Sequence, residues 1–466
     1  MNTLQKLEYI LEQLPLLRSE AILLLGAMFL LLLVRARISQ LLLRAYVSIV
    51  IIAAIFYSSQ EQGAYFSGWI FVDGLVGKMR LLLMVATLVI VWYIRRPYQQ
   101  IEFYFFLLSG LIGALAMVSA QHFLLVYLGV ELASFSSYFL TGMRLTPKSS
   151  EATLKYVLFG GVTSAVMLYG LSLVYGASGS LLLTSLVAHP FSAFGLCLFF
   201  AGLLFKASLI PFHLWVPSTY QEAPSDAVSF FSIVPKIGAF VLIYHLMQLL
   251  PDVYQASAVK MLLAVALTTV LWGTLSALPQ IRLKRTIAFG AIAHSGFMLP
   301  LTLMGEEGLS AFSFYAAIYA LMNLAVFYLI HFHENVEVRS LKFKAYNGFG
   351  KAAPLFGAAM VVILMSLTGL PPTAGFSAKL LLFTQVYQQF ATEADMLWLS
   401  YLIIGILSTV LSLFYYLKLP IAYFLKEPKN KFSLPTFTQA LAAIILALLM
   451  FWGFMQPDIL NSFVLP

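Results

Sequence analysis

Residues 203–240 read LLFKASLIPFHLWVPSTYQEAPSDAVSFFSIVPKIGAF, and they place two lysines in apolar segments on either side of a proline-containing connector. Inserting a lysine near the middle of a bilayer costs at least about 2.5 to 3.5 kcal/mol of free energy. Lys206 and Lys236 therefore each need an interaction partner or a functional role. Desolvation favours the uncharged form of an amine, which lets a buried lysine bind and release a proton. The stretch therefore indicates proton-carrier chemistry inside a membrane.

The composition excludes a soluble globular chain. Of 466 residues, 61% are hydrophobic and 10% are charged, which is typical of a polytopic membrane protein. The single cysteine, Cys197, excludes a disulfide framework and a thiolate metal site. Basic loops between membrane helices explain the formal charge of +8, so it does not indicate a nucleic-acid partner.

Apolar runs long enough to cross a bilayer core of about 30 Å predict fourteen transmembrane helices in an all-α protein. The runs lie at about residues 19–34, 41–58, 74–94, 101–119, 122–142, 151–175, 191–212, 227–250, 258–278, 285–304, 309–331, 353–389, 396–417 and 436–455. Bases gather in alternate connections, at residues 35–44, 95–96, 144–148, 282–285, 339–351 and 418–431. The positive-inside rule then predicts that these basic loops face the cytoplasm or its equivalent, so that both termini of the membrane protein lie on the outer side.

Two of the predicted helices contain breakers. The seventh carries Lys206 shortly before Pro211, and the twelfth carries Pro371 and Pro372 shortly before Lys379. A broken helix is tolerated in a bilayer only where protein or a water-filled cavity satisfies its backbone, so both breaks should face inward. Because the breaks are five helices apart, we expect two inverted five-helix repeats, helices 4–8 and helices 9–13.

The repeats predict how the chain is divided. We expect an N-terminal three-helix segment at residues 1–100, a first repeat at 101–250, a second repeat at 251–425 and a C-terminal helix within 426–466. No linker rich in proline or serine marks an added soluble domain.

Three further ionisable residues are candidates for the same chemistry. Glu131 is nine residues beyond His122, roughly 13 Å along a helix, so it lies near the midplane and needs a counter-charge or a proton. His294 is a possible relay because histidine titrates near neutrality, although a histidine hydrogen-bonded within a bundle is an alternative. Lys155 lies near a cytoplasmic helix end, where it either joins the charged line or anchors the helix.

Several motifs closely resemble the antiporter-like proton-translocating subunits of respiratory complex I (NADH:quinone oxidoreductase), and most of all its N-type subunit. They are YLGVELASFSSYFL, EATLKYVLFGGVTSAVMLYGLSLVYGASGS, LLFKASLIPFHLWVPSTYQEAP, RTIAFGAIAHSGFM and LTGLPPTAGFSAKLLLF, and the resemblance runs from about residue 70 to 425. It implies fourteen helices, inverted repeats and broken helices 7 and 12. One departure is QEAPSDAV in the connector, where many members have a glycine and a second proline.

The resemblance also implies roles for individual residues. Carried over position by position, the proton-translocating residues are Glu131, Lys155, Lys206, Lys236 and Lys379, with His294 as a possible relay. A lysine at position 379, within PPTAGFSAK, favours the N-type subunit, because the M-type subunit has a glutamate there.

The same resemblance implies that the chain is one subunit of a translocating enzyme and performs no redox catalysis itself. We expect no cofactor in this chain, since it has no nucleotide loop, haem motif or metal cluster. Flavin, iron–sulfur clusters and quinone are expected in partner subunits, namely other membrane-arm subunits and a peripheral redox arm.

Two alternatives remain open at this point. A subunit of a multi-subunit Na+/H+ (Mrp-type) antiporter would share the fold and the charged line. A stand-alone secondary transporter of a small solute would instead need a midplane pocket with substrate-specific polar groups. The chain offers single ionisable residues on many helices, which favours proton transfer over such a pocket.

Overall fold

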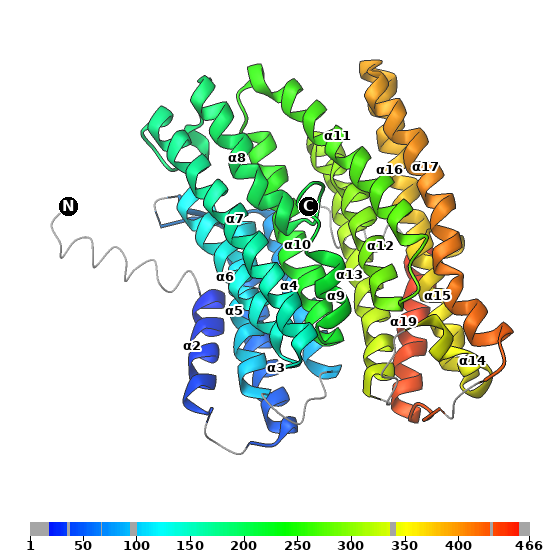
Figure 1. Ribbon diagram of the computed structural model, residues 1–466. Helices are drawn as coiled ribbons and strands as arrows, with labels where there is room; N and C mark the ends of the chain where they lie inside the picture. The colour runs from blue at the N-terminus through cyan, green and yellow to red at the C-terminus, as the bar shows by residue number, and fades with distance from the viewer. Residues whose placement is uncertain are drawn as a thin grey trace. The chain divides into compact units, whose positions relative to one another are not determined.

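The computed structural model describes residues 18–34, 38–66, 68–93, 100–335, 342–428 and 432–455. This part of the chain is built almost wholly from α-helices, as predicted (Figure 1). Ten of the described helices are long and apolar enough to cross a membrane, and α8 (Pro190–Lys206) and α15 (Pro354–Thr368) are shorter apolar helices. The number of membrane crossings and the inverted repeats stay predictions.

Several bases that set the predicted topology lie outside the described residues, namely Arg35, Arg37, Arg95, Arg96, Arg339, Lys429 and Lys431.

The described residues form two compact units. Unit 1 comprises the residues up to Ala207 together with Ile233–Gln255, and unit 2 comprises Ser208–Ser232 and the residues from Ala256 on. Helix α10 (Ser225–Gln248) therefore begins in unit 2 and continues in unit 1. The four-part division of the chain stays a prediction.

Unit 1 is a bundle in which helices that are neighbours in sequence pack together, such as α5 with α6 and α7 with α8. Local sequence sets the helix ends: Thr146 caps the start of α7 by accepting the Ser149 N–H, and Gly179 ends it in a left-handed conformation. Besides α8 and α10, its helices are α2 (Arg18–Leu32), α3 (Gln40–Ser58), α4 (Gly74–Tyr93), α5 (Gln100–Ser119), α6 (Phe123–Gly142), α7 (Pro147–Ser178) and the short η2 (Leu183–Ser185).

Unit 2 packs α13 against α15 and α16, and α19 covers α15. Besides α15, its helices are α9 (Val216–Glu222), α11 (Asp252–Ala277), α12 (Leu283–Met298), α13 (Gly305–Asn335), α14 (Phe349–Ala352), α16 (Ala374–Glu393), α17 (Met396–Tyr416), α18 (Lys418–Pro420) and α19 (Phe437–Met455), with the short turns η3 (Pro300–Thr302), η4 (Phe343–Tyr346) and η5 (Ile421–Leu425). The first turn of α11 belongs to unit 1.

Both predicted helix breaks are confirmed. Helix α8 ends at Lys206 and α9 begins at Val216, and the connector holds Ser208 at a φ of 62°. Helix α15 ends at Thr368 and α16 begins at Ala374, after Gly369 with a φ of 87°. Because left-handed backbone ends a helix, the last carbonyls of α8 and α15 are released from the regular hydrogen-bond ladder.

The all-α prediction missed one element. Strands β1 (Gly63–Tyr65) and β2 (Ile70–Val72) form a short antiparallel hairpin, and Ile70 also pairs with Ala120 after α5. Three-residue strands are too short to give an alternating sequence pattern, which is why this segment was predicted only as a loop.

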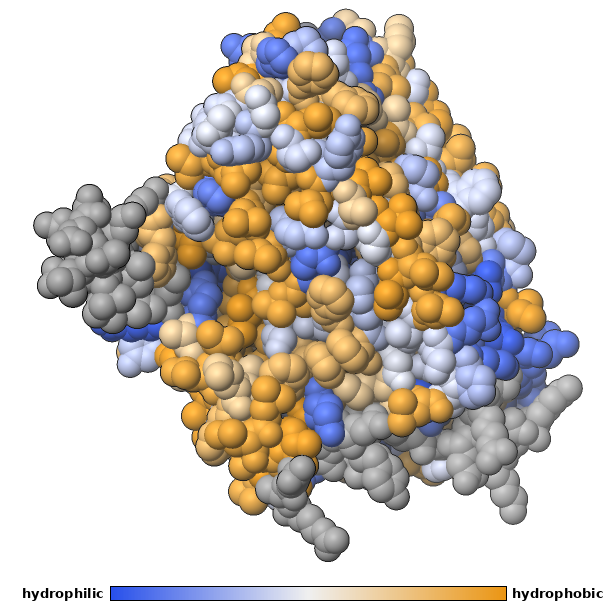
Figure 2. Space-filling view, turned by 60° about the vertical axis from the view of Figure 1, so that its left-hand side comes forward, coloured by the Kyte–Doolittle hydropathy of each residue, from blue (hydrophilic) through white to orange (hydrophobic). Residues whose placement is uncertain are grey.

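Apolar side chains cover much of the described surface. Figure 2 shows one face on which hydrophobic residues (orange) predominate, with polar residues (blue) in patches. Large exposed hydrophobic residues lie on several helices, such as Leu158 and Val162 on α7 and Ile406 and Val410 on α17. A surface of this kind suits contact with lipid or other membrane subunits.

Candidate functional site

Lys206, the last residue of α8, lies in an aromatic enclosure within unit 1. Its side chain is 2% exposed, and its Nζ is 5.9 Å from the ring centre of Tyr138 and 5.9 Å from that of Tyr156. Among the described residues this Nζ has no hydrogen-bond partner. The negative faces of the two tyrosine rings favour a cation there.

Glu131 lies on α6, two turns before Tyr138. It is partly buried, and its carboxylate acts electrostatically on the Lys206 ammonium. In the described structure the two groups are farther apart than the 4.0 Å of a direct ion pair. The expected pair is therefore brought together as neighbours that interact through space.

A glycine on α7 makes the enclosure possible. A Cβ added at Gly160 would overlap the Tyr138 hydroxyl oxygen, so only glycine lets Tyr138 take this place. The Tyr138 and Tyr156 rings meet edge to face with centres 4.7 Å apart. The aromatic faces above Lys206 are thus fixed by packing between α6 and α7.

Lys236 lies in the part of α10 that belongs to unit 1, directly after Pro235. The proline interrupts the backbone ladder within the helix, and the lysine side chain is fully buried. Unit 1 thus holds Glu131, Lys206 and Lys236.

In unit 2, the predicted residues His294 and Lys379 both contact the carboxyl end of α15, at the helix break. The His294 Nε2 lies 3.2 Å from the Leu367 carbonyl oxygen, and the Lys379 Nζ donates to the Thr368 carbonyl oxygen at 2.7 Å. The Lys379 Nζ also lies 4.8 Å from the ring centre of Phe297, three residues after His294 on α12. The carboxyl end of a helix carries a partial negative charge, which suits a cation.

The sequence model of a family described as NADH:quinone oxidoreductase/Mrp antiporter, TM, matches residues 120–412. The chain belongs to this family.

Relatives within the family agree on the N-type subunit. The chain is 33% identical to "NADH-quinone oxidoreductase subunit N 2" of Rhizobium meliloti (strain 1021), over 96% of this chain and 94% of the relative. It is 30% identical to a chain of respiratory complex I from Thermus thermophilus, with a TM-score of 0.82 over 95% of this chain and 98% of that one. A chain of the Mrp complex from Dietzia sp. has a TM-score of 0.80 at 19% identity, over 96% of each chain, which shows a shared fold.

Lys155 stands apart from the other predicted residues of this family member. It lies on the exposed side of α7, where its Nζ contacts the Glu151 carboxylate at 2.6 Å, and the two side chains are 52% and 65% exposed. An exposed pair four residues apart stabilises a helix weakly. The structure does not bring Lys155 next to Lys206, and its role in proton transfer stays a prediction.

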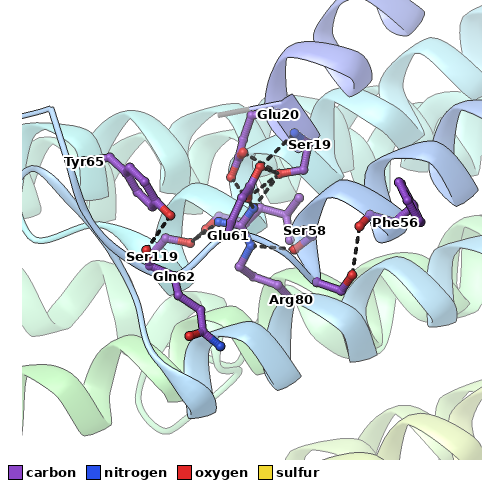
Figure 3. Close-up of polar contacts among 11 residues, drawn as sticks. Ser19, Glu20, Phe56, Ser58, Glu61, Gln62, Tyr65, Arg80 and Ser119 are labelled. Atoms are coloured by element: carbon purple, nitrogen blue, oxygen red, sulfur yellow. Dashed lines mark hydrogen bonds and ion pairs between the residues drawn. The ribbon is translucent and has the colours of Figure 1, made fainter. Parts of the chain in front are cut away.

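Sequence reasoning missed a charged cluster in unit 1. Figure 3 shows Arg80 of α4 between two carboxylates: its Nη2 lies 2.7 Å from Glu61 and 2.8 Å from Glu20. The same guanidinium donates to the hydroxyls of Ser19, Ser58 and Ser119. The cluster thus joins α2, α3, α4 and α5 through one side chain.

The Arg80 cluster holds one more carboxylate than cation. Burial, followed by the charge of Glu20, raises the pKa of the Glu61 carboxyl above its usual range, against the opposing effect of Arg80. Arg80 was visible in the sequence as a base inside a predicted helix, and such a base calls for a partner. Its partners could not be read because they come from distant segments.

A second missed pair lies in unit 2. Lys284, expected in a cytoplasmic loop, is buried and contacts the Glu334 carboxylate at 2.9 Å as well as the Ala223 carbonyl oxygen. The other Glu334 oxygen accepts the Ser225 N–H at 3.1 Å. These contacts hold the start of α12, the end of α13 and the connector between α9 and α10 together.

In the part of the chain that the structure describes, no three histidine, cysteine or acidic side chains gather as potential metal ligands.

Proposed function

We propose that this chain translocates protons as a membrane-arm subunit of a complex I type NADH:quinone oxidoreductase. The observation that carries the proposal is the placement of buried lysines at helix breaks. Lys206 and Lys379 each lie beside an interrupted helix, where a cation meets aromatic faces or helix carbonyls in place of a tight carboxylate pair. Such a cation is held loosely enough to lose its proton during a cycle.

In this mechanism the field of Glu131 helps Lys206 to keep its proton. A shift that weakens this field favours proton release, and Lys236 in the same unit is the next acceptor. His294 and Lys379 hold a proton in the second unit. The redox reaction that drives the shift occurs in partner subunits, which would carry flavin, iron–sulfur clusters and quinone.

The proposal places the chain in the bacterial cytoplasmic (inner) membrane with both termini on the outer side. Its partners would be other antiporter-like and small membrane subunits and a peripheral redox arm. The support for partners is the likeness to a chain of a whole respiratory complex.

Replacing single charges tests this function. In the intact complex reconstituted in vesicles, we expect Lys206→Ala and Glu131→Ala to lower the number of protons moved per electron sharply. Lys260→Ala, an exposed lysine of α11 that pairs with Asp395, is the matched control. An unchanged proton-to-electron ratio in both Lys206→Ala and Glu131→Ala would refute the proposal.

The fold shared with the Mrp complex favours a second candidate, a subunit of a Na+/H+ antiporter. The two functions differ in what accompanies the chain. Flavin and iron–sulfur absorbance with quinone reductase activity in the purified assembly supports the first function. Sodium-dependent proton exchange in an assembly without redox groups supports the second.

A further inference from the structure

The hydrogen bonds of His294 define where its protons lie. Its Nε2 faces the Leu367 carbonyl oxygen at 3.2 Å, and its Nδ1 faces the Tyr315 hydroxyl at 2.9 Å. A carbonyl oxygen can only accept, so Nε2 carries the hydrogen in the neutral ring. Nδ1 is then the nitrogen with the lone pair, and it accepts the O–H of Tyr315.

An added proton can therefore bind His294 only at Nδ1. The Leu367 oxygen accepts a hydrogen bond from Nε2 but does not take up its proton. His294 gains its proton through Tyr315. The Tyr315 hydroxyl gives its hydrogen to Nδ1 while its oxygen receives another proton. The tyrosine therefore stays neutral, and the histidine gains one positive charge. Release follows the reverse steps. In this geometry His294 stores a proton, and the Tyr315 hydroxyl contacts the nitrogen that receives it.

Lys379 donates a hydrogen bond to the next carbonyl at the same helix end. Leu367 and Thr368 are the last two residues of α15, and the Lys379 Nζ donates to Thr368 at 2.7 Å. Phe297 lies beside both groups, since its ring centre is 4.8 Å from the Lys379 Nζ and 6.1 Å from the His294 ring centre. A helix end supplies only about half a negative charge, so it cannot balance two full cations.

We propose that His294, Lys379 and the carboxyl end of α15 hold one added proton at a time, and that His294 gains and loses its proton through Tyr315. This deepens the proposed function and rests on it. When the imidazole is charged the lysine is neutral, and when the lysine is charged the imidazole is neutral.

The titratable side chains around this site come from three helices. Among the described residues they are Lys379 on α16, Tyr315 and Tyr319 on α13 and, around these tyrosines, Tyr401, Tyr415 and Tyr416 on α17. The phenols stay neutral at working pH, so the charge at the site is set by His294 and Lys379.

The first test removes the loading group with Tyr315→Phe in the intact complex, reconstituted in vesicles. We expect fewer protons per electron than in the wild type, with a deficit that grows between about pH 6 and about pH 8 because protons become scarcer. The double variant with His294→Gln should be no worse than His294→Gln alone, since both changes block one step. Quinone reductase activity with an uncoupler reports on assembly.

The matched control is Tyr423→Phe. It deletes an equally buried tyrosine–histidine hydrogen bond, Tyr423 to His333 at 2.6 Å, elsewhere in unit 2. We expect a wild-type ratio and pH profile. Equal losses in Tyr315→Phe and Tyr423→Phe, or a wild-type ratio at every pH in Tyr315→Phe, would overturn the role of Tyr315.

The second test fixes the charge with Lys379→Arg, because arginine does not release its proton in proteins. A permanent cation at the end of α15 should stop the cycle and lower the ratio as far as Tyr315→Phe does. A wild-type ratio in Lys379→Arg would overturn the shared site. Either failure is separate from that of the proposed function, which depends on Lys206→Ala and Glu131→Ala.

Discussion

At the scale of single residues, the environment of Lys206 depends on one glycine. Gly160→Ala should push Tyr138 away from the lysine, because the new Cβ would overlap the tyrosine hydroxyl. We expect a lower proton-to-electron ratio with quinone reductase activity retained. Gly161→Ala is the control, since a Cβ there has nothing within 4 Å, and an equal loss in both variants would argue against the aromatic enclosure.

The raised pKa of Glu61 predicts a pH-dependent stability. The folded protein binds this proton more tightly than the unfolded chain, whose glutamate titrates at about 4.3. The stabilising contribution is therefore complete below that value and is lost as the pH rises through the raised native pKa.

Thermal unfolding of the purified complex in detergent, followed against pH, measures this effect. Glu61→Gln should remove the part of the pH dependence that Glu61 causes. Glu307→Gln, a change in the first turn of α13, should leave the dependence as it is. An unaltered dependence in Glu61→Gln would contradict the assignment.

Sequence reasoning found these residues unevenly. Lys206, Lys236 and Lys379 were predicted to be buried because an amine inside an apolar run has few other options, and all three are buried. Their partners could not be predicted, since the tyrosines around Lys206 lie on two other helices and the acceptor of Lys379 is a backbone carbonyl. Contacts of this kind have no local pattern.

At the scale of elements, the break between α15 and α16 depends on Gly369. This residue has a φ of 87°, and a Cβ there would lie 2.7 Å from the Lys379 Cδ. Gly369→Ala should therefore both strain the backbone and displace the lysine from Thr368, lowering the proton-to-electron ratio. The backbone strain alone costs about 1 kcal/mol or more.

Gly179→Ala separates the two effects. Gly179 also has a left-handed φ, of 67°, but a Cβ there meets nothing within 4 Å. We expect it to lower thermal stability without changing proton translocation. If Gly369→Ala did no more than Gly179→Ala in both assays, the contact with Lys379 would be unimportant.

The helices themselves were largely predictable. A proline five to seven residues from an embedded lysine marked both breaks, and the ends of the apolar runs lie within six residues of the helix ends. The hairpin was missed because its pairing joins short segments with no repeating pattern. Lys284 was assigned to a loop because charge alone does not reveal a buried partner such as Glu334.

At the scale of the whole molecule, the predicted topology can be tested by thiol labelling. Two variants in a Cys197→Ser background each carry one new cysteine, from Ser59→Cys or from Lys148→Cys. Position 59 lies in a connection expected on the outer side and position 148 in one expected on the inner side. Both positions are exposed. An impermeant reagent added to intact cells should label Ser59→Cys alone. Labelling of Lys148→Cys alone would reverse the orientation.

The function of the whole molecule was predictable because the order of the family motifs along the chain indicates it. The family match covers residues 120–412, which include Glu131, Lys206, Lys236 and Lys379. The Arg80 cluster lies before this segment, and its contacts depend on helices that precede the matched region.

The Arg80 cluster also has a consequence for biogenesis. Glu20 and Glu61 leave the ribosome before Arg80, and the hydroxyl of Ser119 comes later still. Until the arginine arrives, two acidic groups near the edge of the bilayer lack their counterion. We therefore expect α2, α3, α4 and α5 to be released from the insertion machinery together, as a set that matures in one step.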